Sequence, residues 1–126
     1  MITIYKGGTE GLERIDTYES GAWINVVNPT PKEIEELVSW FNIPSDFLTD
    51  PLDVDERARI EREEGCILIL LRSPKREPAE ADIPFTTLPI GIIFTQNLLI
   101  TVSLNESDVI KEFVTGKVKH FSTDQH

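Results

Sequence analysis

Four carboxylates lie within the seven positions from Asp50 to Glu56, in the stretch T-D-P-L-D-V-D-E-R, where the other two are Asp53 and Asp55. Carboxylate oxygens are the ligands that Ca²⁺ and Mg²⁺ prefer, so binding of a divalent cation is the first chemistry that this stretch could perform. Acidic residues also form turns and helix caps that face water. Composition by itself favours this second interpretation, with the two arginines that follow partly compensating the charge.

A comparison with the EF-hand loop tests whether the stretch is a self-contained calcium site. Asp53 and Asp55 match the first and third positions of that loop, and Glu64 falls at the twelfth. The fifth position is Arg57 and the sixth is Ala58, where the turn requires glycine. The sequence therefore argues against an all-protein calcium cage. Mg²⁺ keeps several waters and needs only one or two carboxylates, so a weak site completed by another chain stays open.

Residues typical of catalysis are scarce. The sequence has no dinucleotide-binding, P-loop, H-E-x-x-H or G-x-S-x-G motif, and its only histidines are His120 and His126, close to the end of the chain. A single cysteine, Cys66, excludes an internal disulfide, and its place at the start of an apolar run predicts a core position. We therefore predict that the protein is not an enzyme, and keep a small carboxylate-based hydrolase as a third hypothesis.

The charge of the chain favours cationic partners. Twelve Lys and Arg against twenty-two Asp and Glu give a net charge of -10, and residues 44 to 66 hold eight acids and three bases. Such a surface repels phosphate backbones and anionic lipids, which argues against nucleic-acid binding. The partners that remain are divalent cations or a basic protein. The second of these defines an alternative function, a free-standing acidic interaction module that binds a basic partner.

Length and hydropathy predict one domain, residues 1–126, with no membrane span of its own. No positively charged segment precedes an apolar stretch at the start, which predicts a cytosolic chain without a secretory signal. Residues 83 to 105 carry no charge, but two prolines, a glycine and a polar turn at residues 95 to 97 divide them. We expect two buried strands there instead of a transmembrane helix.

The elements that must position the acidic residues follow from periodicity and from start and stop signals. We expect strands at 2–6, 12–18, 23–27, 57–63, 66–72, 88–94 and 98–102, and a polar loop at 73–82. Thr30 and Glu33 predict a capping box that starts a helix ending near Asn42. Ser45 is expected to cap a shorter second helix, which Pro51 stops.

A last helix is expected from Ser107 to about Gly116. The order of elements then predicts an α/β (α+β) fold with a mixed, mainly antiparallel sheet sandwiched between helices. The strand at 57–63 is expected at an edge and the strand at 66–72 in the centre. Trp23 and Trp40 are both expected in or at the edge of the core.

Several segments together resemble one known family. They are W-I-N-V-V-N-P-T-P-K-E-I-E-E-L, N-I-P-S-D-F-L-T-D-P-L-D-V-D-E-R-A-R-I-E, C-I-L-I-L-L-R-S-P and P-I-G-I-I-F-T-Q-N-L-L-I-T-V. Their order and spacing, over about residues 20 to 115, resemble the amino-terminal cytosolic domain of the CorA-type divalent-cation transporters. This resemblance implies a mixed sheet between helices at the cytosolic end of a homopentameric magnesium channel or transporter.

The resemblance also implies the role of the chain. In that family the soluble domain precedes a stalk helix and two membrane helices with a Gly-Met-Asn pore motif, which this sequence does not contain. We therefore expect a truncated cytosolic regulatory domain on the cytoplasmic side of the cell membrane, connected to it only through missing C-terminal helices. Its expected function is to sense or regulate ion flux through the full-length pentamer.

Family members bind regulatory divalent ions between subunits, through an acidic pair just after the short second helix. The pair falls on Thr49 and Asp50, of which only Asp50 is a carboxylate. The resemblance thus implies that Asp50 is one ligand of a weak regulatory Mg²⁺ site shared with a neighbouring subunit. No cofactor is expected to be needed for folding. Asp53, Asp55 and Glu56 are expected to form a solvated acidic turn.

Overall fold

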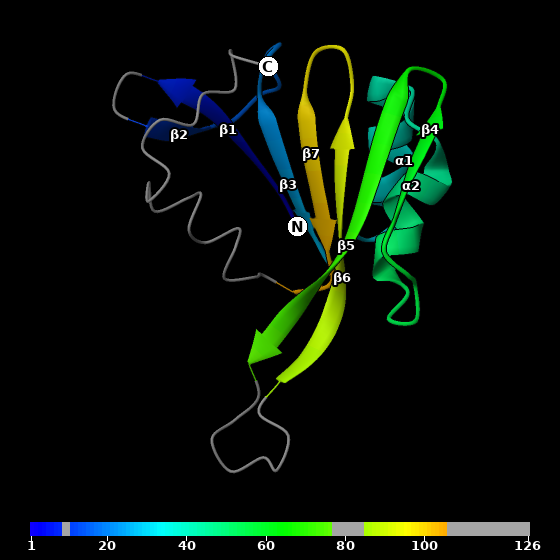
Figure 1. The fold of residues 1–126 in the computed structure, drawn as a ribbon. Helices are drawn as coiled ribbons and strands as arrows, with labels where there is room; N and C mark the ends of the chain where they lie inside the picture. Colours follow the sequence, from blue (N-terminus) through cyan, green and yellow to red (C-terminus); the bar gives the residue numbers. More distant parts are fainter. Residues whose placement is uncertain (9–10, 77–84, 106–126) are drawn as a thin grey trace.

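The computed structural model describes residues 1–8, 11–76 and 85–105, which form a sheet with two helices packed against it (Figure 1). The sheet has seven strands in the order β2-β1-β3-β7-β6-β5-β4. The strands are β1 (Ile2–Gly8), β2 (Gly11–Ile15), β3 (Trp23–Val27), β4 (Arg59–Glu63), β5 (Cys66–Arg76), β6 (Phe85–Phe94) and β7 (Leu99–Ser103).

Strand directions confirm the predicted mixed, mainly antiparallel sheet. Neighbouring strands are antiparallel except β3 and β7, which run parallel. The expected edge and central strands are also confirmed, because β4 pairs only with β5 while β5 lies between β4 and β6. A tight turn at Glu64 and Gly65, both with positive φ, joins β4 to β5.

The hairpin of β5 and β6 is longer than predicted. The segment from Ser73 to Arg76, expected as a loop, continues the ladder and pairs with residues 85 to 88. Figure 1 shows this end of the hairpin extending beyond the other strands. Pro74 is tolerated there because the neighbouring strands do not reach this part of the ladder, and proline is compatible with an edge.

The first helix, α1 (Pro31–Phe41), begins as predicted. The backbone N–H of Glu33 donates to Thr30 Oγ1 at 3.1 Å, and that of Thr30 donates to Glu33 Oε1 at 2.9 Å, which completes the capping box. Asn42 ends the helix in the left-handed conformation, φ 57°.

The second helix, α2 (Ser45–Thr49), differs from the prediction at both ends. Its N-cap is Pro44, with no side-chain cap, so Ser45 belongs to the first turn. Pro51 does not stop the helical path, because a 3-10 turn, η1 (Asp50–Leu52), continues it. Proline fits the first turn of such a segment, where its missing N–H needs no partner.

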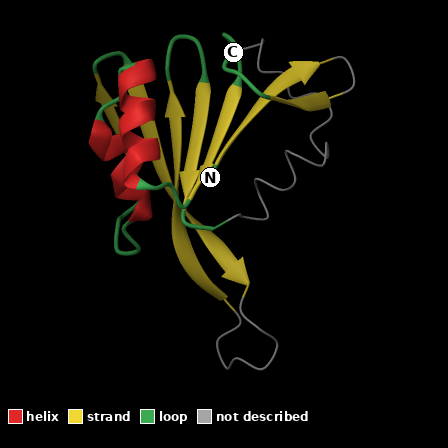
Figure 2. Cartoon of the chain, turned by 180° about the vertical axis from the view of Figure 1, so that it is seen from behind, coloured by secondary structure: helices red, strands yellow, loops and turns green. Residues whose placement is uncertain are grey.

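Both helices cover one face of the sheet (Figure 2). A continuous apolar core lies between the helices and the sheet. The core includes Leu37 and Phe47 from the helices and the predicted Cys66 from β5. The helix expected from Ser107 lies outside the described residues, so helices on the second face stay a prediction. In the part of the chain that is described, no helix is long and apolar enough to cross a bilayer.

The two tryptophans occupy different environments. Trp23 is 1% exposed, as expected, and its indole N–H donates to Thr101 Oγ1 at 2.9 Å. The prediction for Trp40 was wrong, since its side chain is 60% exposed. The residues of α1 that face the sheet are Ile34, Leu37, Val38 and Phe41. Trp40 is adjacent to this stripe in the sequence but lies beyond its edge on the helix.

Candidate metal-binding site

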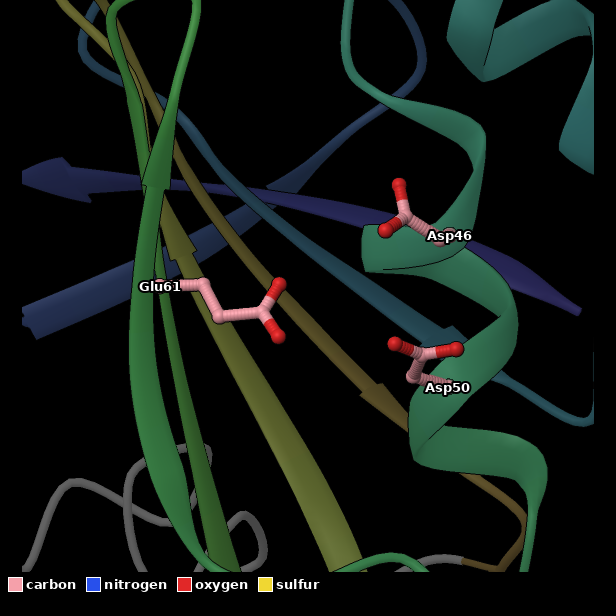
Figure 3. Close-up of side chains that lie close together, drawn as sticks. All are labelled: Asp46, Asp50 and Glu61. Atoms are coloured by element: carbon pink, nitrogen blue, oxygen red, sulfur yellow. The ribbon is translucent and has the colours of Figure 1, made fainter.

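Three carboxylates from two elements converge beside the edge strand. Asp46 lies in α2 and Asp50 begins η1, four residues later, so both lie on one side of the helical path. Glu61 comes from the facing strand β4 (Figure 3). One carboxylate oxygen from each residue lies within 4.8 Å of the others. The acidic stretch from Asp50 to Glu56 thus supplies only one of these three carboxylates.

A glycine on the sheet sets the position of Asp50. Pro51, which follows it, is buried against β6 at Gly91. A Cβ at Gly91 would lie 2.4 Å from Pro51 Cγ, closer than any real contact. The missing side chain therefore allows η1 to approach the sheet and brings Asp50 next to β4.

Arg59 lies among these carboxylates as an internal counter-cation. It shares one face of β4 with Glu61, two residues away. Its guanidinium donates to Asp50 Oδ2 at 2.7 Å, to Glu61 Oε1 at 2.6 Å and to Glu56 Oε2 at 2.5 Å. Three carboxylates thus bind one guanidinium, and with Asp46, which lies near Asp50 and Glu61, the cluster has a formal charge of -3. This excess negative charge would attract a further cation.

The acidic surroundings alter two pKa values. Burial raises the pKa of Asp50, and the charge of Glu56 raises it further, while Arg59 acts in the opposite direction. Hydrogen bonds to Glu61 and Glu56 raise the pKa of Arg59, whose guanidinium is charged at physiological pH in any case. A divalent cation at Asp50 would relieve the repulsion that raises the pKa of its carboxyl group.

The rest of the acidic stretch forms a turn. Asp53 and Asp55 are exposed, and Asp53 Oδ1 accepts a hydrogen bond from the backbone N–H of Asp55 at 3.0 Å. Arg72 of β5 holds this turn to the sheet by donating to the carbonyl of Val54 at 2.9 Å and that of Glu56 at 2.7 Å. The side chain of Glu56 departs from the expectation of a solvated residue, because it is half-buried and bonded to Arg59.

The cluster fits a loosely held hard cation. Ligands on opposite sides of Ca²⁺ are about 4.6 to 5.2 Å apart, and about 4.0 to 4.2 Å apart on Mg²⁺. The oxygens of Asp46, Asp50 and Glu61 all lie within 4.8 Å of one another, which is compatible with Ca²⁺ and with Mg²⁺ that keeps part of its water shell. Thr49 is exposed and adds no carboxylate. An ion at this position would have to share Asp50 and Glu61 with Arg59.

Sequence reasoning found Asp50 but missed three of its neighbours. The sequence analysis singles out none of Asp46, Glu61 and Arg59 as part of a site. Two signals could have found them: the four-residue spacing of Asp46 and Asp50, and the alternation of Arg59 and Glu61 along a strand. The contact between strand and helix, which brings the pairs together, has no local signal.

Comparisons with known proteins agree on one family. Residues 18–121 match the family described as CorA-like Mg²⁺ transporter protein. The cobalt/magnesium transport protein CorA of Methanocaldococcus jannaschii is 35% identical over 89 residues, which cover 71% of this chain and 26% of that protein. This chain therefore spans about a quarter of the length of that curated relative.

Three solved structures are similar to this chain over most of its length. The complete CorA magnesium transporter of M. jannaschii has a TM-score of 0.70 and 27% identity, covering 94% of this chain and 38% of that one. The soluble domain of the same protein gives a TM-score of 0.74 at 22% identity, covering 96% and 47%. The ZntB cytoplasmic domain of Vibrio parahaemolyticus gives 0.70 at 17%, covering 94% and 49%. These last two likenesses concern the fold alone.

Proposed function

Because this chain belongs to the CorA-like Mg²⁺ transporter family, we propose that it is the cytosolic ion-sensing domain of a divalent-cation transporter. The observation that carries the proposal is the convergence of Asp46, Asp50 and Glu61 within 4.8 Å. Hard oxygen ligands of this kind suit Mg²⁺ and related divalent ions. The domain regulates ion flux through an assembly of full-length subunits, in which a neighbouring subunit completes the coordination.

Binding at this site is weak. The formal charge of -3 draws a divalent ion in, while the guanidinium of Arg59 competes for Asp50 and Glu61. With three protein ligands and retained waters, the dissociation constant is on the order of millimolar, as for loosely coordinated exposed sites. Such an affinity suits a sensor of free cytosolic Mg²⁺, because occupancy then changes over the range of concentration that must be sensed.

The regulation follows from linkage. An ion bound between subunits neutralises carboxylates that otherwise repel each other, so it stabilises the closed assembly by mass action. When the concentration of Mg²⁺ falls, the ion dissociates, repulsion returns and open states gain population. Within this chain, Asp50 is the ligand shared with the neighbouring subunit, Asp46 and Glu61 are the two other carboxylate ligands, and Arg59 sets the affinity by competing for Asp50 and Glu61.

The test compares two substitutions that remove the same charge, made in the transporter that carries this domain. Asp50→Ala should weaken the inhibition of transport by cytosolic Mg²⁺, whereas Asp55→Ala should leave it unchanged, because Asp55 is exposed in the turn. Flux in reconstituted vesicles, measured against internal Mg²⁺ concentration, is the readout. Unchanged Mg²⁺ inhibition in Asp50→Ala would refute the assignment of this residue.

A further inference from the structure

A groove on the helix-covered face lies away from the acidic cluster. Its volume is about 460 Å³, and it runs between α1 and the start of β1. Ile2 and Ile4 of β1, Ile24 of β3 and Leu37 of α1 form an apolar floor. A mostly apolar cavity between about 300 and 1,000 Å³ is typical of a binding site.

Aromatic side chains and one acid form the rim, and we call this cavity the Trp40 groove. Trp40 and Tyr18 are 60% and 38% exposed, and both line it together with Phe41 and Asp16. Phe41 holds the two other rings, with centroids 4.6 Å from Tyr18 and 6.2 Å from Trp40, both edge to face. Exposed aromatic rings fixed by packing are the kind of side chain that dominates binding energy at interfaces.

The sheet beside the groove has room for one further helix. The two helices lie toward the β4 end of the sheet, and neither covers β1 and β2 (Figure 2). Adjacent strands are about 4.8 Å apart, so the part of the sheet formed by β1 and β2 is about 10 Å wide. A helix with its side chains measures about 10 to 12 Å across. One further helix beside α1 would complete the layer.

Charges around the groove define the partner. Lys6 on β1 is paired with Glu19 at 3.4 Å, and the terminal amine is paired with Glu33 at 3.3 Å. In the described part of the chain, Asp16 and Glu36 have no ion pair. Glu36 lies one turn before Trp40 on α1. Asp16 in the lining of the groove and Glu36 one turn from Trp40 thus lack an ion pair with the described residues, on a chain of net charge -10.

We propose that the Trp40 groove binds a basic amphipathic helix of a partner protein. The apolar side chains of that helix occupy the isoleucine floor, as in other complexes of a helix in a groove. Its arginine or lysine lies over the face of Trp40 and pairs with Asp16, which combines a cation–π contact with an ion pair. This surface is independent of the metal-binding cluster and of the proposed ion sensing.

The test uses a synthetic helical peptide of roughly fifteen residues, with leucine at every third or fourth position and flanking arginines. Binding to the full chain is followed by the indole N–H signal of Trp40 in NMR titrations. We expect Trp40→Ala to weaken binding at least tenfold and Asp16→Asn several-fold. Ile60→Ala, at a 65% exposed apolar residue on β4, and the charge-matched Glu63→Gln should bind as the unaltered chain does.

Three results would overturn the proposal. The first is equal binding of a peptide whose arginines are replaced by neutral citrulline, because the positive charge of the helix would then contribute nothing to the affinity. The second is self-association of the chain that Trp40→Ala abolishes, which would make a second copy the occupant. The third is protection of Trp40 from acrylamide quenching in the free chain, which would mean that the chain covers its own groove.

Discussion

Replacing Arg59 by glutamine tests the electrostatics of the candidate site most directly. The guanidinium donates to Asp50 and Glu61 at 2.7 and 2.6 Å, so an ion on the same oxygens would lie about 4 Å from its charge. Two unit charges at about 4 Å interact by about 1 kcal/mol in water, so the repulsion of a divalent ion is about 2 kcal/mol. Removing it should tighten Mg²⁺ binding roughly thirtyfold at low salt, and about tenfold at physiological ionic strength.

The same substitution should destabilise the metal-free chain. Three partly exposed ion pairs are lost, each worth up to about 1 kcal/mol, and the carboxylates are left to repel each other. We expect a loss of about 1 to 2 kcal/mol in the free energy of unfolding, which Mg²⁺ restores in Arg59→Gln more than in the unaltered chain.

Mg²⁺ titrations by NMR and urea unfolding with and without Mg²⁺ are the assays. Arg62→Gln is the matched control, because Arg62 is exposed on the same strand and the change in net charge is identical. Its Mg²⁺ affinity should rise by no more than about twofold, since its charge is far more screened. If Arg59→Gln binds Mg²⁺ no more tightly than Arg62→Gln, Arg59 does not compete with the ion and the assigned position of the site is wrong.

Three further predictions concern Asp50 and the turn that carries it. Burial and Glu56 raise its pKa above the ordinary value of 3.8, and binding of a cation requires the charged form, so the Mg²⁺ affinity should fall as the pH is lowered from 7 to 4. Without an ion, the raised pKa means that the contribution of Asp50 to stability is fully present below pH 3.8 and is lost as the pH rises through the folded-state pKa. Urea unfolding of Asp50→Asn and of the unaltered chain between pH 3.5 and 6 would measure this loss. A stability difference that does not depend on pH would contradict the prediction. Gly91→Ala should lower the free energy of unfolding by about 1 to 3 kcal/mol and reduce the Mg²⁺ affinity. The reason is that its Cβ would meet Pro51 Cγ at 2.4 Å and displace the turn that carries Asp50. Stability and affinity equal to those of the unaltered chain would disprove this role of the glycine.

Much of the fold could be predicted because its signals are local. Thr30 and Glu33 form a capping box by themselves, and the alternating apolar residues of the strands identify the faces that must be buried. The errors arise where the outcome depends on tertiary contacts instead of neighbours along the chain. The extension of β5 through Pro74 depends on its partner strand, and the exposure of Trp40 depends on where the apolar stripe of α1 meets the sheet.

The candidate site was predicted in part for the same reason. Asp50 was found through the resemblance of the surrounding segments to a family, while its neighbours Glu61 and Arg59 looked like ordinary charges of an edge strand. Their proximity arises from long-range packing, in which Gly91 admits Pro51 and brings the helical turn against β4. No pattern within a few residues of Asp50 records that approach.

The sequence by itself determined the elements, the mixed sheet, the negative charge and the family, because periodicity, capping, composition and motif order are properties of neighbours along the chain. Tertiary structure alone decided that three carboxylates meet, that Arg59 lies among them, and that Trp40 borders an open groove. The physical reason is that electrostatic interaction and burial depend on distance in space. Residues 11 positions apart, such as Asp50 and Glu61, become neighbours only when the sheet and helices pack.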